Sequence, residues 1–197
     1  LTFIQWQMRR KLVDEGNMEP ILQKTMQSIH KNGNSMNESK RKRPRWTKEL
    51  PFTIKDARKE PVDVMWFVGD YASFDPRNQV VTRSFAKLMK QAGVDFGLLY
   101  EAEMNAGNDV RRVGEEGLYE FLANANISTL EKCDFNSIVT TDPHSFNTIR
   151  NEYPDFGGEF EIQHYTTLLK QLFEQGKLKL NKKLDYRVTF HDPCHLG

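Results

Sequence analysis

The fold is decided by the stretch Val64-Met-Trp-Phe-Val-Gly-Asp70, in which five apolar residues are followed by a glycine and an aspartate. A continuous apolar run of this length is typical of a strand buried on both faces of a parallel sheet. The next apolar stripe, at residues 78–92, has helical spacing and is followed by Gly93, a residue that favours the end of a helix. A buried strand followed by an amphipathic helix is the unit from which α/β folds are built.

The same alternation of strand and helix continues along the chain. We expect further strands at residues 94–100, 137–141, 160–165 and 186–190. We expect further helices at residues 113–132, from Asp142-Pro143 onward, and at 168–173. In the longest of these, the residues aligned towards the core are Leu118, Phe121, Leu122 and Ala125. The sequence therefore predicts an α/β fold with a mainly parallel sheet of about five strands and helices on both faces.

Two segments of different composition precede this domain. Residues 1–37 predict a helical N-terminal segment. Residues 38–61 are rich in Lys, Arg and Pro, which predicts a basic linker or extended arm. The linker is interpreted either as an electrostatic patch for an anionic partner or as a solvated segment anchored to the core by Trp46 and Phe52. After this linker we expect the α/β domain at residues 62–190 and the beginning of a further unit at residues 191–197.

Composition excludes several classes of protein. The 197 residues carry a net charge of +1, which gives no reason to expect a nucleic acid partner. Two cysteines cannot form a disulfide framework, so a reducing compartment is expected. The longest apolar run is too short to cross a bilayer, and no signal peptide is visible. These features predict a cytoplasmic protein, which would reach the cytoplasmic face of a membrane only through segments outside these residues.

Polar loops follow three of the predicted strands, at 69–76, 101–109 and 140–145. Because the carboxyl ends of parallel strands meet at one edge of a sheet, where α/β proteins bind ligands, we expect these loops to form the candidate site. Their glycines lack the spacing of a dinucleotide-binding loop, and no lysine-bearing phosphate loop is present. The sequence therefore argues against a nucleotide cofactor.

The loops carry an ordered set of motifs. They are Phe67-Val-Gly-Asp70-Tyr-Ala-Ser-Phe-Asp-Pro76, Asn105-Ala-Gly107, Thr140-Thr-Asp-Pro-His-Ser-Phe-Asn147 and, at the end of the chain, His191-Asp-Pro-Cys194-His-Leu-Gly197. From about Val64 onward the chain resembles the cysteine-rich (CCG) domain of heterodisulfide reductase and related iron–sulfur proteins. That family holds an iron–sulfur cluster with one cysteine after the first strand, Cys-Cys-Gly after the second and Cys-x-x-Cys after the third. The resemblance places those five cysteine positions at Asp70, Asn105, Ala106, Asp142 and Ser145.

Every one of these cysteines is replaced, although Gly107, Pro143 and His144 of the pattern remain. Iron–sulfur clusters need thiolates, because soft sulfur ligands match the iron–sulfide core. We therefore expect a degenerate repeat that binds no cluster and whose polar residues serve the structure. One alternative is a polar pocket for a metal or small ligand, built from Asp70, Asn105, Gly107, Asp142 and His144. Another is a hydrolase-like metal site built on Asp70, Asp142 and His144.

The two cysteines have different expected roles. The resemblance makes Cys194 the first cluster ligand of a second cysteine-rich repeat that begins at residues 191–197, a metal-binding role that applies only in the intact protein. Cys133 lies outside every motif and is expected to be a small core residue.

The resemblance implies a piece of an iron–sulfur electron-transfer oxidoreductase. Residues 62–190 would act as a scaffold and docking domain, inactive by itself and without a cofactor, while the intact protein carries the cluster. Electrons would pass from a flavoprotein or ferredoxin-type module to a quinone-linked or disulfide acceptor. The alternative is a non-redox binding module that uses the basic arm and the polar strand-end crevice to hold an anionic partner or a metal.

Overall fold

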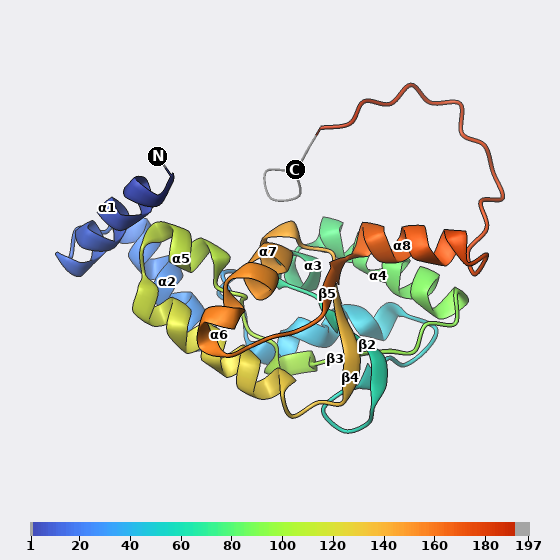
Figure 1. Cartoon of the computed structure of the whole chain (residues 1–197), viewed down its shortest axis with the longest axis horizontal. Coiled ribbons are helices and arrows are strands. Elements are labelled where there is room, and N and C mark those ends of the chain that lie inside the picture. Colours follow the sequence, from blue (N-terminus) through green and yellow to red (C-terminus); the bar gives the residue numbers. More distant parts are fainter. Residues whose placement is uncertain (1, 192–197) are drawn as a thin grey trace.

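The computed structural model describes residues 2–191 and contains a sheet of five parallel strands (Figure 1). The strands are β1 (Lys55–Asp56), β2 (Val62–Phe67), β3 (Phe96–Leu98), β4 (Phe135–Thr140) and β5 (Ile162–His164). Their order across the sheet is β1-β3-β2-β4-β5, and each neighbouring pair is parallel. Val64 lies opposite Phe96 on one side and Ser137 on the other, which makes β2 the central strand. The predicted parallel α/β sheet is confirmed.

Helices precede the sheet and alternate with its strands. The α-helices are α1 (Thr2–Asp14), α2 (Pro20–Asn32), α3 (Asp70–Phe74), α4 (Pro76–Gln91), α5 (Asn108–Val113), α6 (Glu116–Leu130), α7 (Pro143–Asn151) and α8 (Tyr165–Glu174). The 3₁₀ helices are η1 (Lys40–Glu49), η2 (Tyr100–Ala102) and η3 (Tyr153–Phe156). Among the described residues, no helix combines the length and the apolar character that a membrane span needs.

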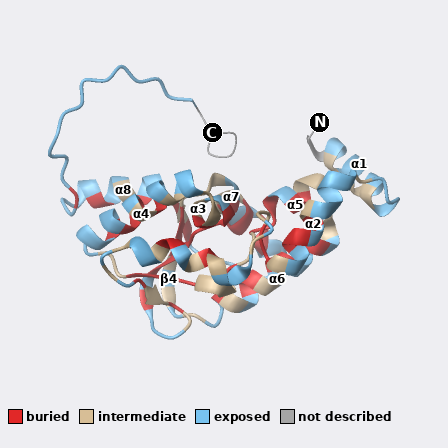
Figure 2. Cartoon of the chain, turned by 180° about the vertical axis from the view of Figure 1, so that it is seen from behind, coloured by how far each residue is buried: buried red, intermediate tan, exposed pale blue. Residues whose placement is uncertain are grey.

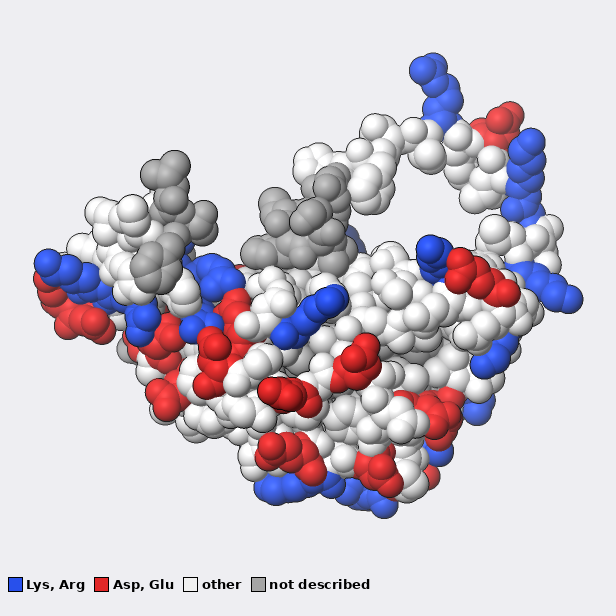
Figure 3. Space-filling view, in the orientation of Figure 1, with Lys and Arg blue, Asp and Glu red and all other residues white. Residues whose placement is uncertain are grey.

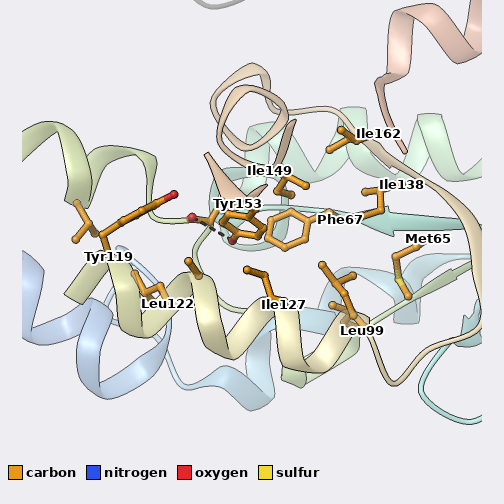
Figure 4. Close-up of a cluster of buried hydrophobic side chains, with 14 of the residues drawn as sticks. Met65, Phe67, Leu99, Tyr119, Leu122, Ile127, Ile138, Ile149, Tyr153 and Ile162 are labelled. Atoms are coloured by element: carbon orange, nitrogen blue, oxygen red, sulfur yellow. Dashed lines mark hydrogen bonds between the residues drawn. The ribbon is translucent and has the colours of Figure 1, made fainter. Parts of the chain in front are cut away.

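The core lies on both faces of β2. Met65 and Phe67 join a buried cluster with side chains of α2, α6 and α7, shown in Figure 4. Trp66 and Val68 point to a second cluster with side chains of α4, α8 and η1. There the ring of Trp66 packs edge-on to Phe85, with centroids 5.0 Å apart. Helices therefore cover both faces, as predicted, and Figure 2 shows their buried sides turned towards the sheet.

The strand expected at residues 186–190 is not formed, and the fifth strand is instead β1. Tyr186, Val188 and Phe190 are 75%, 87% and 83% exposed. Their alternation with polar residues fits a half-buried strand, but a strand needs a neighbour with which to form hydrogen bonds. In Figure 1 the stretch that follows α8 forms an arc apart from the body, and Figure 3 shows basic side chains along this arc.

The expectation of a basic linker or extended arm at residues 38–61 is wrong for residues 40–49. This stretch forms η1, and the side chains of Arg43 and Trp46 are buried in the body of the protein. The ring of Trp46 lies 5.3 Å from that of Trp66, and Phe52 packs beside the same cluster. The anchoring role of Trp46 and Phe52 is thus confirmed. The helix that carries Trp46 was not predicted, because the Lys-, Arg- and Pro-rich composition indicated a linker.

The long helix expected at residues 113–132 is divided in two. Helix α5 ends at Val113, and Gly114 adopts a left-handed conformation (φ +105°) before α6 begins at Glu116. A side chain at Gly114 would meet backbone atoms of α1 at 2.7 Å, so the turn also lets α1 approach closely. On α6, Leu118 and Leu122 are buried as predicted, but Phe121 is 47% exposed.

Candidate functional site

The three polar loops meet at the carboxyl edge of the sheet. They enclose a cavity of about 50 Å³, room for a few water molecules. The residues that line it include all five positions singled out by the resemblance, namely Asp70, Asn105, Ala106, Asp142 and Ser145, together with His144. Neighbouring parallel strands have their carboxyl ends at the same edge of the sheet, which is why positions far apart in the sequence converge here.

Asp70 begins α3 and is fully engaged by neighbouring donors. One carboxylate oxygen pairs with Nη2 of Arg43 at 2.6 Å. The other accepts a hydrogen bond from the side-chain amide of Asn105 at 2.6 Å and two from Ser35, one from its backbone N–H and one from its hydroxyl. Because the Asp70 side chain is 4% exposed and already accepts these four bonds, a metal ion could bind it only by displacing a partner.

Glu103 completes a buried triad with Arg43 and Asp70 that sequence reasoning missed. Its side chain is 1% exposed and lies 2.9 Å from Nη1 of Arg43. It also accepts hydrogen bonds from the backbone N–H groups of Val68 and Gly69, where β2 ends. Burial raises the pKa of Glu103, against the opposing effects of Arg43 and of the two N–H groups. The basic segment is therefore joined to the site by an internal ion pair.

The second loop is held by Asn105 and by residues of α6. The Asn105 side-chain oxygen accepts a hydrogen bond from the backbone N–H of Gly107 at 2.8 Å. Gly107 has a left-handed conformation (φ +94°), and a Cβ there would lie 2.6 Å from the ring of Tyr119. The backbone carbonyl of Ala106 accepts from the hydroxyl of Tyr153, which in turn accepts from Asn126. Asn126 and Tyr153 were not predicted, because a buried asparagine and tyrosine have no recognisable spacing.

The third loop is an N-terminal cap of α7. Asp142 accepts hydrogen bonds from the backbone N–H groups of His144 and Ser145 and, at 2.5 Å, from the Ser145 hydroxyl. Nδ1 of His144 lies 3.1 Å from the side-chain amide of Asn108. The expected capping role of Asp142 is confirmed, and the loop satisfies its own polar groups.

A larger cavity of about 590 Å³ opens beside the small one. It shares Asp70, Asp142 and His144 with the small cavity and extends over Tyr71 to Tyr165 at the start of α8. This is the polar strand-end crevice that the loops suggested. Its acidic side chains are those already described, apart from the exposed Asp109.

The residues at this edge do not fit an iron–sulfur cluster or a metal ion. The methyl group of Ala106 offers no donor atom, and Asp70 is already paired with Arg43. Among residues 2–191, no group of three or more His, Cys, Asp or Glu side chains is arranged to hold a metal. The hydrolase-like metal site considered for Asp70, Asp142 and His144 therefore has no support in the geometry.

Of the two cysteines, Cys194 lies outside the described residues, and Cys133 is not among the residues that line the two cavities at this edge. The thiol of Cys133 donates to the backbone carbonyl of Thr129, and burial raises its pKa. A raised pKa keeps Cys133 protonated, in keeping with the predicted core role rather than with a metal ligand.

Comparison with known proteins supports the resemblance that the motifs indicated. Residues 64–150 match the family described as the cysteine-rich domain (CCG). "Probable iron-sulfur-binding oxidoreductase FadF" of Bacillus subtilis is 43% identical over 96% of this chain and 28% of its own length. "EtfAB:quinone oxidoreductase" of Syntrophomonas wolfei is 33% identical over 97% of this chain and 28% of its own length.

A more distant relative links the chain to the reductases themselves. A subunit of the "Dihydromethanophenazine:CoB--CoM heterodisulfide reductase" of Methanosarcina mazei is 30% identical over 70% of this chain and 35% of its own length. The chain thus spans between a quarter and just over a third of the length of these three relatives. No solved structure matches it. Residues 64–150 are therefore a cysteine-rich (CCG) domain, and the chain belongs with homologues that are iron–sulfur oxidoreductases related to heterodisulfide reductase.

Proposed function

We propose that this region is a cluster-free scaffold and docking domain within an iron–sulfur electron-transfer oxidoreductase. One observation carries the proposal. The five positions that hold cysteine in the family line one cavity here, and their polar side chains form hydrogen bonds or ion pairs with one another or with Arg43. Carboxylate, amide, hydroxyl and methyl groups cannot replace a set of thiolates. The role left to this edge is to hold three loops in a fixed arrangement.

The protein's own residues account for that arrangement. Arg43 pairs with both Asp70 and Glu103 and so places one positive charge between two carboxyl groups that are buried near the end of β2. Asn105 joins the first loop to the second, because it donates to Asp70 and accepts from Gly107. The polar network thus connects the loops without a metal.

Electron transfer enters the proposal through the relatives. Their names describe iron–sulfur binding, a quinone oxidoreductase that uses EtfAB, and a heterodisulfide reductase subunit. We infer that the intact protein holds its cluster outside this domain, with Cys194 as one ligand, and passes electrons from a flavoprotein or ferredoxin-type module to a quinone or disulfide. A position at the cytoplasmic face of a membrane, through other segments, fits the same scheme.

The test measures iron and sulfide in the intact protein after anaerobic reconstitution. Asp142→Ala and Ser145→Ala are expected to leave the iron content per polypeptide unchanged, whereas Cys194→Ser is expected to lower it. Circular dichroism of each variant checks that the fold is retained. Loss of iron in Asp142→Ala or Ser145→Ala, with the fold intact, would refute the assignment of this domain as cluster-free.

A second candidate is a binding module without a redox role. It is favoured by the exposed basic residues of η1, which suit an anionic partner without a redox role equally well. An intact protein that contains no iron after reconstitution, yet still binds an acidic partner, would favour this candidate over the first.

A further inference from the structure

Positive charge is concentrated on two neighbouring helices. Together η1 and α4 contain ten Lys and Arg and a single acidic residue, Glu49. The whole chain has 28 basic and 27 acidic residues, so 18 basic and 26 acidic residues remain elsewhere. A protein that is nearly neutral as a whole thus carries a positive face on a body of net negative charge.

The two helices form one continuous surface. Arg83 of α4 lies 3.3 Å from Glu49 at the end of η1, and Nζ of Lys90 lies 5.7 Å from the ring centre of Phe52, just beyond it. Arg83, Lys87 and Lys90 follow the spacing i, i+4, i+7, which places them on the same side of α4. That side faces η1, so the basic residues of both helices adjoin each other.

The geometry of η1 separates an inner row from an outer row. In a 3₁₀ helix, residues three positions apart lie above one another. Arg43 and Trp46 form the buried row, and Arg45 and Lys48 form an exposed row. Because the buried row packs η1 against the body, the exposed basic side chains project from a helix that is held in place.

The outer charges are not neutralised within the protein. In the part of the chain that the structure describes, Lys40, Arg41, Arg45, Lys48 and Lys87 are exposed and make no ion pair. Several like charges held close together repel one another and destabilise the fold slightly. An opposing negative surface would relieve that repulsion.

The chemistry of this face favours an acidic protein over the other polyanions. Single-stranded nucleic acids are bound by exposed aromatic rings between basic residues, but Trp46, the aromatic residue of η1, is 1% exposed. A helix that lies in a membrane surface inserts a broad apolar side. The only large apolar side chain of η1 is that same buried tryptophan, and α4 exposes no large apolar residues other than Val80, Val81 and Leu88. A rigid set of point charges matches a complementary protein surface.

We propose that η1 and α4 form the docking face for an acidic electron-transfer protein, an inference that rests on the docking role proposed above. Arg43, in the middle of η1, binds Asp70, so a partner on this face would lie beside the strand-end loops. Electrostatic attraction of this kind acts mainly on the rate of association and weakens with salt.

The experiment uses the intact protein and, as the probe, purified EtfAB flavoprotein from the same organism. Association rates are measured by stopped-flow fluorescence at low and at physiological ionic strength. The double variant Arg45→Glu with Lys48→Glu is expected to lower the rate constant at low salt by about tenfold or more and to flatten its salt dependence. The matched control, Lys132→Glu with Lys179→Glu, makes the same change in net charge at exposed positions outside the helices and strands and is expected to retain most of the rate.

Three outcomes would overturn the inference. The first is an unchanged association rate in the η1 double variant, and the second is an equal loss of rate in the control variant. The third is that the η1 double variant keeps its rate with EtfAB but loses binding to phosphatidylserine vesicles or to duplex DNA. Thermal unfolding of each variant verifies its fold. Iron content separates this test from that of the proposed function. Loss of iron in Asp142→Ala refutes the cluster-free scaffold and leaves the docking face standing, whereas normal iron with no effect of the η1 variant refutes the docking face alone.

Discussion

Replacement of Arg43 by methionine tests whether the buried triad holds the site together. Methionine keeps much of the side-chain volume but removes the positive charge. The side chains of Asp70 and Glu103 are 4% and 1% exposed, so the variant leaves two carboxylates in the interior without their counter-ion. Removal of one partner of a buried ion pair costs about 3–5 kcal/mol. Against a typical total stability of about 5–15 kcal/mol, that is a large fraction.

The loss should depend on pH, with a sign that follows from Glu103. Burial already raises the pKa of Glu103, and the loss of Arg43 removes the largest effect that lowers it. A carboxyl whose pKa is higher in the folded than in the unfolded chain contributes most to stability below the unfolded value, and this contribution is lost as the pH rises through the folded pKa. The deficit of Arg43→Met is therefore expected to be smaller at pH 5 than at pH 8.

The assay is urea unfolding at both pH values, followed by the fluorescence of the buried Trp46 and Trp66. The second variant, Arg43→Met with Glu103→Gln, removes one of the two stranded charges and should recover part of the lost free energy of unfolding. A deficit below about 1 kcal/mol in Arg43→Met, or one that does not shrink at pH 5, would refute the reasoning.

Three further changes test other parts of the structure. Hydrogen bonds from Arg58 lower the pKa of Asp56 to about 2, so Asp56 stabilises the fold above its ordinary pKa of 3.8 and loses this effect as the pH falls through about 2. Arg58→Met should therefore cost about 1–2 kcal/mol at pH 7 and less at pH 2.5, measured by urea unfolding. Gly107→Ala should lower the free energy of unfolding by at least about 1–3 kcal/mol, measured by thermal unfolding, because the added Cβ would meet the ring of Tyr119. Leu122→Ala, at a fully buried position, should cost about 2–5 kcal/mol in urea unfolding.

Matched controls keep these predictions specific. Gly157 also has a left-handed conformation (φ +83°), but a Cβ there would meet nothing within 4 Å, so Gly157→Ala measures backbone strain alone. If it costs as much as Gly107→Ala, contact with Tyr119 contributes nothing. Phe121→Ala, next to Leu122 but 47% exposed, should cost much less than Leu122→Ala. An acid titration in which Arg58→Met and the wild type differ by a constant amount would contradict the role given to Asp56.

The sequence predicted the sheet well because its signals were local. The run at Val64 and the cap at Asp142-Pro143 each specify their own element through side chains a few residues apart. The ordered motifs also indicated which positions would meet at the sheet edge, because parallel strands end together. What local patterns missed were partners from distant segments, namely Glu103, Asn126 and Tyr153.

The sequence by itself determined the α/β alternation, which follows from residue types and their spacing. It also showed that no cysteine stands at the five positions that the family resemblance assigns. Only the tertiary structure decided that Arg43 is an internal counter-ion rather than a surface charge, and that β1 rather than residues 186–190 completes the described sheet. The physical reason is the same in both cases. A buried charge and a strand are each stable only with a partner, and the partner is chosen by proximity in space.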